Sequence, residues 1–471
     1  MTPRFGFGPN DGSDNSEDEN SPKKDQNNSA FPGMEELISQ FQSFGFNPGA
    51  LFSQMGAALG NPAAANSGSL VPLETIREIG RTYIAAQSQL PVGSVDLAQC
   101  TQALDIANTW LDNVTIFPAL TRTPATAWSR KEWLDASAAG WQKLVEPLAQ
   151  GMATALTSIV EQGEASGDFE ESGINIPGMA AGAPALGALL PILRTFMGAL
   201  FASQLGNSVG TLATSVTGAN DVAIPLFTSF DTLAEDGSII PVGDYQARLI
   251  PQNLIGWAEG LDLPEDEVRI YLALREAAAA RLFSHTPWLA QYIYDAVAAY
   301  ASGIRVDIQT IQEQAESAMN SGELDINNPQ SIQIAINQGL FTPEQSPKQE
   351  AALARLEIAL ALIEGWIDHV TTAAGAERLP SFAALNETLR RRRATNAPTQ
   401  QLFAQLFGLH VSPRKSRECS KFWSDVTSLI EIKGRDARWE DPAFLPGADE
   451  IGDAKKFLDS TTVPDDLSGL I

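Results

Sequence analysis

Residues 268–283 most constrain the fold, because this stretch has the length and apolar spacing of a buried helix. Pro264 precedes it and is followed by Glu265 and Asp266, a pattern typical of a helix start. Apolar side chains then recur at intervals of three and four residues, so they share one side of a helix. The sequence therefore predicts a helix in the core of the protein.

Much of the remaining chain has the same helical periodicity. We expect helices over residues 74–89, 95–112, 126–147, 148–163, 186–203, 288–301, 307–322, 329–338, 349–374 and 381–393. The strand candidates are residues 223–227 and 238–242, since β-branched residues and prolines suit short edge strands. Gly206 and Gly210 stand one helical turn apart and predict a close helix contact. The predicted fold class is mainly α with a small β element.

The charge balance excludes some function classes. A formal net charge of −26 argues against binding to nucleic acid or to anionic lipid, because both need a basic surface. The longest apolar run, residues 178–193, is shorter than the roughly 20 residues of a membrane span. The N-terminus has no apolar export segment, and Cys100 and Cys419 suggest neither a disulfide framework nor a cysteine-based zinc site. We expect a cytoplasmic protein without a membrane span or a nucleic-acid partner.

Composition divides the chain into five segments. Residues 1–30 are polar and acidic, with too little apolar surface to offset the entropy of ordering, so they are predicted to form a disordered tail. Residues 31–70 combine a phenylalanine-rich amphipathic segment with a linker. We expect an N-terminal helical region over 71–220, a second region containing the central helix over 221–450, and a C-terminal tail over 451–471.

A series of short motifs carries a resemblance to a known family over about residues 30–450. The motifs are 123–128 (TPATAW), 205–212 (LGNSVGTL), 251–253 (PQN), 263–269 (LPEDEVR), 275–276 (RE), 287–289 (PWL), 364–366 (EGW), 390–392 (RRR) and 434–436 (GRD). On these motifs the chain resembles an actinobacterial family of zinc-dependent metalloprotease-like proteins. A related branch is named for association with deazaflavin coenzyme biosynthesis. The resemblance implies a helical, zincin-like (gluzincin-related) core over 221–450.

The resemblance also implies a metal site that this chain has lost. Members that keep the site carry His-Glu-x-x-His on the core helix, and an acidic third ligand comes from a later helix. Here Glu276 matches the water-polarising glutamate, but Arg275 and Ala279 occupy the two histidine positions. Glu364 best matches the later acid, and Asp368 lies one turn further on the same face. We expect no cofactor here, because zinc is expected only in members with the histidine pair.

The lost site leads to a prediction about contacts and leaves two other arrangements open. We expect Arg275 to form a buried ion pair with Glu364 or Asp368 that fills the vacated space. His285 follows position 275 by ten residues, as the third histidine of a metzincin motif would, although Leu282 replaces the turn glycine of that motif. A relocated site could combine Glu276, His285, Glu364 and His369.

Residues 390–393 are four consecutive arginines at the end of a predicted helix. Cations suit the negative end of a helix dipole, so we expect these arginines to pair with acidic neighbours. A site for phosphate or for an acidic partner is the alternative.

Three functions fit these features. The first is a catalytically degenerate metallohydrolase-like protein, a pseudo-enzyme that binds an unidentified protein or peptide partner as a scaffold. The second is an active zinc-dependent metalloprotease or hydrolase with a non-standard metal site and Glu276 as its base. The third is a small-molecule or coenzyme-binding protein, although the chain contains no glycine-rich phosphate loop. Since both histidines are replaced, we expect the pseudo-enzyme.

Overall fold

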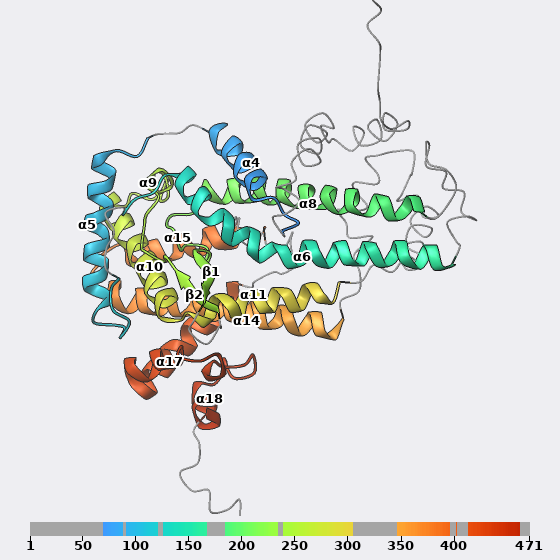
Figure 1. Cartoon of the computed structure of the whole chain (residues 1–471). Coiled ribbons are helices and arrows are strands. Elements are labelled where there is room, and N and C mark those ends of the chain that lie inside the picture. Colours follow the sequence, from blue (N-terminus) through green and yellow to red (C-terminus); the bar gives the residue numbers. More distant parts are fainter. Residues whose placement is uncertain are drawn as a thin grey trace, which may run out of the picture.

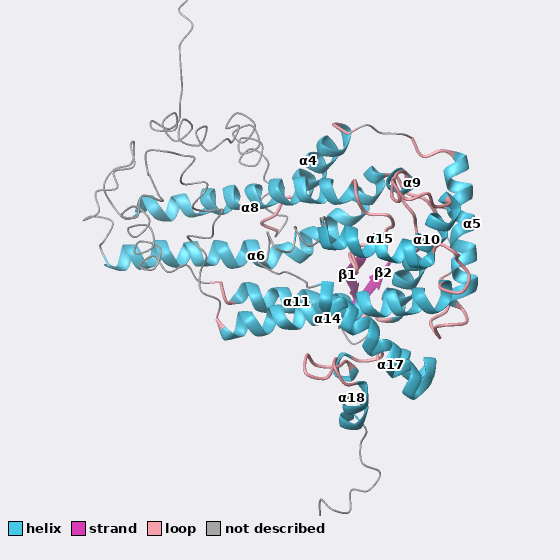
Figure 2. Ribbon diagram, turned by 180° about the vertical axis from the view of Figure 1, so that it is seen from behind, coloured by secondary structure: helices cyan, strands magenta, loops and turns pink. Residues whose placement is uncertain are grey.

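The computed structural model describes residues 69–87, 91–120, 126–166, 184–233, 239–304, 346–395, 402 and 413–461. These residues are mainly helical, as predicted, with one small pair of strands (Figures 1 and 2). The elements are α4 (Leu73–Ala85), α5 (Ser94–Leu111), α6 (Arg130–Ser166), α8 (Pro184–Ala213), β1 (Thr228–Leu233), β2 (Ile239–Gly243), α9 (Pro251–Leu254), α10 (Glu265–His285), α11 (Trp288–Ser302), α14 (Pro347–Gly375), α15 (Phe382–Thr395), α17 (Pro413–Ala437), η1 (Pro442–Phe444) and α18 (Ala454–Thr461).

Helix α10 lies at the centre of the core, which confirms the prediction for residues 268–283. It begins after Pro264, and three acidic residues in its first turn face the positive end of the helix dipole. Every residue from Tyr271 to Phe283 is buried. Helices α5, α14 and α15 pack around it. A helix buried on all sides places its polar residues inside the protein, where each needs a partner.

Four long helices form the body of the molecule. Helices α6, α8, α11 and α14 extend to one side of the core, and contacts join α6 to α8, α11 to α6 and α14 to α11 (Figure 1). Helix α14 starts with a capping box, in which Ser346 and Gln349 satisfy each other's backbone N–H groups. Further along α14, Glu364 and Asp368 reach Arg275 of α10.

The predicted close contact at Gly206 and Gly210 is present between α8 and α4. A Cβ atom at Gly206 would lie 2.9 Å from the carbonyl oxygen of Ile76, and one at Gly210 would lie 3.2 Å from Cα of Gly80. A larger residue at either position would therefore force the two helices apart.

The prediction for residues 223–227 was wrong. The antiparallel strands are β1 and β2, so the second strand candidate is confirmed but the first lies just ahead of β1. Ile224 and Leu226 are buried, and a Cβ at Gly140 of α6 would lie 2.0 Å from the carbonyl oxygen of Leu226. The apolar character of this segment therefore reflects packing against α6 rather than strand pairing.

Two predicted boundaries also differ from the structure. The helices expected on either side of Pro147 are one continuous helix, α6. Val145 and Leu148 are buried on either side of the proline, so packing compensates for the lost backbone hydrogen bond. The expected tail over 451–471 includes α18, where Phe457 is fully buried and contacts the ring of Phe422.

Several predictions lie outside the described residues. They are the disordered tail over 1–30, almost all of the segment over 31–70, and the helices over 307–322 and 329–338. Among the helices that the structure describes, none combines the length and apolarity that crossing a membrane requires.

Candidate functional site

Helices α10 and α14 bring four of the predicted site residues to one small pocket. Arg275, Glu276 and Ala279 come from α10, and Glu364 comes from α14. The rest of the lining consists of Thr217, Asn220, Asp221, Leu272, Ile367 and Arg393. The cavity has a volume of about 10 Å³, which is room for about one water molecule.

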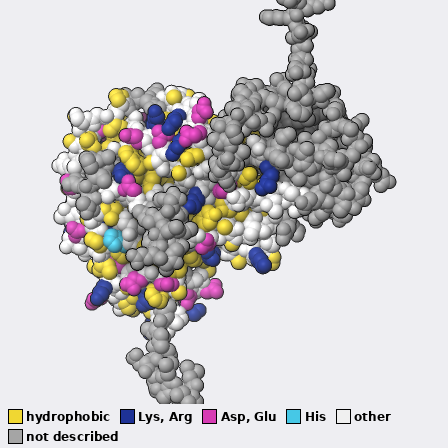
Figure 3. All heavy atoms as spheres, viewed as in Figure 1, with side chains coloured by type: hydrophobic (Ala, Val, Ile, Leu, Met, Phe, Trp, Pro, Cys, Tyr) yellow, Lys and Arg dark blue, Asp and Glu magenta, His cyan; other side chains and the backbone are white. Residues whose placement is uncertain are grey.

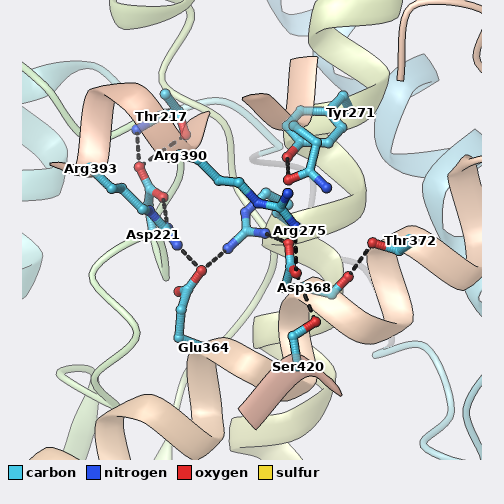
Figure 4. A network of polar contacts seen from close by, with 11 residues as sticks. Thr217, Asp221, Tyr271, Arg275, Glu364, Asp368, Thr372, Arg390, Arg393 and Ser420 are labelled. Atoms are coloured by element: carbon cyan, nitrogen blue, oxygen red, sulfur yellow. Dashed lines mark hydrogen bonds and ion pairs between the residues drawn. The ribbon is translucent and has the colours of Figure 1, made fainter. Parts of the chain in front are cut away.

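The predicted ion pair between Arg275 and Glu364 is present in this pocket (Figure 4). Glu364 Oε1 accepts from Arg275 Nη2 and is also paired with Arg393 Nη1, so two guanidinium groups share one carboxylate. Arg393 lies at the end of α15 and continues the chain of charges to Asp221, at 3.4 Å. Burial, and then repulsion from Arg275, lowers the pKa of the Arg393 guanidinium to about 10. Arg393 is therefore still charged at neutral pH.

Asp368 belongs to the same network. Its Oδ1 lies 3.6 Å from Arg275 Nη1, and its Oδ2 lies 3.7 Å from Arg390 Nη2 and accepts a 2.8 Å hydrogen bond from Ser420 Oγ. The expectation that the arginine run pairs with acidic neighbours is thus confirmed, since Arg391 also pairs with Glu387. The network ties α10, α14, α15 and α17 together around a buried cation.

Surface charges contribute much less than this buried network. On the face seen in Figure 3, acidic and basic side chains are mixed with apolar ones over the described residues. Exposed pairs one turn apart, such as Arg414 with Glu418, contribute about 0.3–0.5 kcal/mol each. Arg275 and Glu364 have side chains only 6% and 16% exposed, so breaking their pair costs more.

Glu276 is oriented away from this chain of charges, toward a backbone turn. Its carboxylate accepts hydrogen bonds from the backbone N–H of Asn220 (2.9 Å), from Nδ2 of Asn220 (2.8 Å) and from the backbone N–H of Arg248 (3.1 Å). Burial nevertheless raises the pKa of the Glu276 carboxyl to about 8. A Cβ at Gly218 would lie 2.3 Å from Glu276 Oε2, so only glycine leaves room for the carboxylate.

Three short backbone segments build the wall that Glu276 contacts. Leu249 lies between Ala127 and Gly218, with a parallel bridge to the first and an antiparallel bridge to the second. The N–H of Trp128 donates to the carbonyl of Leu249 at 2.9 Å, and the N–H of Ala219 donates to the carbonyl of Arg248 at 2.8 Å. These hydrogen bonds hold the three segments together beside Asn220, whose Nδ2 donates to Glu276 Oε1.

The two candidate histidines lie elsewhere. His285 Nδ1 is 2.8 Å from the carbonyl oxygen of Arg281, and its ring stacks on Phe117. It follows Glu276 by nine residues, or about 13 Å along the helix axis. His369 Nε2 is 2.9 Å from Thr427 Oγ1, and burial lowers its pKa to about 4. The relocated site is wrong, because neither histidine lines the pocket that holds Glu276 and Glu364.

The pocket residues do not fit a zinc ion. A guanidinium has no lone pair to offer, and Ala279 has no ligand atom. Glu364 is committed to two arginines, and Glu276 to three N–H donors. Across the part of the chain that the structure describes, no group of three or more His, Cys, Asp or Glu side chains is placed to hold a metal ion.

Six of the ten residues that line the pocket were not predicted individually, and the charged and amide side chains among them are Asn220, Asp221 and Arg393. Asn220 and Asp221 come from a turn after α8, and Arg393 was predicted only as part of the arginine run. The turn-forming sequence Gly218-Ala-Asn-Asp221 was the available signal, because such residues favour tight turns. It gives no information on which distant helix the turn contacts.

A family comparison agrees with the fold. A family described as zincin-like metallopeptidase matches residues 71–458. A solved structure from Chloroflexus aurantiacus, described provisionally as a hydrolase with a novel fold, aligns with a TM-score of 0.49 and 18% identity, covering 83% of this chain and 98% of the other. A comparison with curated proteins gave no match.

Proposed function

The chain belongs to the zincin-like metallopeptidase family, and we propose that it binds a peptide or protein partner without hydrolysing it. In this proposal α10 and α14 keep the scaffold of a metallohydrolase, while arginines take the space of the metal. Glu276 is then a vestigial base, and Arg275, Ala279 and Glu364 are vestigial metal-site positions. No cofactor is required.

One observation carries the proposal. Glu364, the position of the acidic ligand, is paired with Arg275 and Arg393 at once. A cation added to this pocket would have to displace the buried guanidinium of Arg275 and the half-buried guanidinium of Arg393, and separating Arg275 from its carboxylate costs about 3–5 kcal/mol. The same positions therefore disfavour a metal both by lacking ligands and by supplying positive charge.

A second candidate is an active hydrolase with a non-standard site. It is favoured by the raised pKa of Glu276, since a carboxylate with a pKa near neutrality suits general-base catalysis. It is disfavoured by the three N–H donors that hold both oxygens of that carboxylate.

Metal content and peptide hydrolysis together test the proposal. Purified full-length protein is incubated with equimolar Zn²⁺, dialysed, and analysed for bound metal, and it is also incubated with a mixture of peptides that is followed by mass spectrometry. We expect no retained zinc and no cleavage above that of the Glu276→Gln variant. Near-stoichiometric zinc that is lost in Glu364→Gln, or cleavage that is lost in Glu276→Gln, would establish the active hydrolase instead.

A further inference from the structure

A cavity of about 190 Å³ lies at the end of α10, apart from the charged pocket. The last turn of α10, the start of α11 and the segment after β2 contribute to its lining, which includes Asp244, Tyr245, Phe283 and Ser284. It shares no lining residue with the charged pocket. Since roughly 150 Å³ is enough for a benzene-sized molecule, this cavity has room for a ligand with one ring.

One backbone carbonyl at this helix end lacks its usual donor. In a continuing helix the carbonyl of Phe283 would accept from the N–H of residue 287, but residue 287 is a proline and has no N–H. The side chains of His285 and Thr286 contact the two preceding carbonyls, at 2.8 and 2.6 Å. Phe283 and Pro287 both line the cavity. The cavity therefore lies at the negative end of the α10 dipole, beside a carbonyl oxygen that can accept.

The charged group of the cavity is a carboxylate. Among the described residues that line it, Asp244 carries the only full charge. Its Oδ2 accepts a 2.9 Å hydrogen bond from Arg248 Nη2, and its side chain is 63% exposed, so the carboxylate has lone pairs left for another donor. The Arg248 guanidinium lies 4.3 Å from the centre of the Trp128 ring and does not line the cavity. The carboxylate, the helix end and the hydroxyl of Ser284 together favour a positively charged donor.

Aromatic and apolar groups form much of the remaining wall. The rings of Tyr245 and Phe283 pack edge to face, with their centroids 5.7 Å apart. A Cβ at Gly243 would overlap the ring of Tyr245, so the glycine gives this ring its place. Leu120 and Pro287 also line the cavity. Aromatic surface beside a few acceptors suits an organic cation, because cations are attracted to the faces of aromatic rings.

We propose that this cavity binds a small primary ammonium ion carried on an apolar body about the size of one ring. The N–H groups of the ammonium donate to the Asp244 carboxylate, the Phe283 carbonyl and Ser284 Oγ, and the body packs against the rings of Tyr245 and Phe283. A hard metal cation fits less well, since Ca²⁺ takes about six to eight oxygen ligands and the described lining supplies one carboxylate. This site is independent of the proposed function, because it is a separate cavity.

Calorimetric titration of the full chain at neutral pH with two matched probes tests the proposal. Benzylamine is a primary ammonium ion on one ring, and benzyl alcohol has nearly the same shape without the charge. We expect benzylamine to bind about ten-fold more tightly than benzyl alcohol, because hydrogen bonds that involve a charged group are stronger than neutral ones. Ca²⁺, added at matched ionic strength, should not displace benzylamine.

Variants assign the binding to the cavity. Asp244→Asn keeps the shape of the side chain but removes its charge, and should weaken benzylamine binding about ten-fold with little effect on benzyl alcohol. The matched control Asp262→Asn changes an exposed carboxylate outside the cavity and should leave the binding of both probes unchanged. Ser284→Leu places an apolar side chain in the cavity and should abolish the binding of both probes. Thermal unfolding of each variant checks that it is folded.

Four results would overturn the proposal: no binding of benzylamine, equal affinity for the two probes, displacement of benzylamine by Ca²⁺, or benzylamine binding that either Asp244→Asn or Ser284→Leu leaves unchanged. The third result would assign a metal site to the cavity, and the last would place the ammonium ion away from the cavity or from its carboxylate. Zinc content and peptide cleavage, which test the proposed function, do not depend on any of these results, so the two proposals fail separately.

Discussion

Glu364→Gln should destabilise the protein strongly, although it changes only one oxygen to nitrogen. The substitution removes the negative charge that Arg275 and Arg393 share, and leaves an amide oxygen that can accept hydrogen bonds but carries no full charge. Breaking a buried ion pair from one side costs about 3–5 kcal/mol, because the remaining charge stays buried.

The structure lowers that figure, since neither arginine is left entirely alone. Arg275 keeps Asp368 at 3.6 Å, and Arg393 keeps Asp221 at 3.4 Å and is partly exposed. We therefore expect the free energy of unfolding to fall by about 2–3 kcal/mol, roughly the lower half of the range for a broken buried pair. For a chain of this size the melting temperature should fall by about 2–3 °C.

The assay is thermal unfolding of wild type and variant, each with and without EDTA. The matched control is Glu387→Gln, which removes an exposed partner of Arg391 and should cost less than about 0.5 kcal/mol. Wild-type protein should be insensitive to the chelator. If EDTA lowered the wild-type melting temperature as far as the substitution does, and had no effect on the variant, then a metal would be holding Glu364 and the reasoning would be refuted.

Three further predictions concern the same core. Because the pKa of Glu276 is raised, the folded protein binds a proton that the unfolded chain has released between pH 4.5 and about 8. The free energy of unfolding of the wild type, relative to that of Glu276→Gln, should therefore fall over this range and then level off. Urea titrations at each pH measure this difference, and a rising or flat difference would contradict the prediction. Positions 275, 279 and 364 line one pocket, so the triple variant Arg275→His, Ala279→His, Arg393→Gln should bind zinc through two histidines and Glu364. Calorimetry and metal analysis measure the binding. A folded variant without affinity for zinc would show that these three positions do not have the geometry of a zinc site. Gly365→Ala should lower the free energy of unfolding by about 1–3 kcal/mol in urea titrations, because its Cβ would lie 2.5 Å from Cβ of Cys419 in α17. The control Gly452→Ala, whose Cβ would have nothing within 4 Å, should change stability little. Equal effects of the two substitutions would show that α14 and α17 can separate freely.

Local pattern was sufficient to predict α10 and most of the helices around it. Residues 268–283 have helical periodicity, a proline start and no interruption, and these signals act within one segment. The pairing of Arg275 with Glu364 came from the family resemblance, because no local pattern links positions so far apart in the sequence. The family match over residues 71–458 supports that use of the resemblance.

The parts of the site that were missed depend on contacts between distant segments. Glu276 contacts a turn at Asn220, which is held by a bridge between Gly218 and Leu249. Each of these segments is too short to carry its own periodicity, so its position depends on the packing of α8 and α10. The first strand was misplaced for a related reason: burial against α6 produces the same apolar pattern as a strand.

The burial of α10 on every side couples the amino acids at positions 275, 364 and 393. A carboxylate at 364 needs a positive partner in that interior, and either a metal ion or a guanidinium can supply the charge. In a relative with histidine at 275, a change to alanine alone would remove a metal ligand and leave the negative charge at 364 with less positive charge around it. Electroneutrality therefore predicts which combinations relatives can hold: histidines at 275 and 279 should occur without an inward-facing arginine at 393, and an arginine at 275 should occur only where 364 remains acidic.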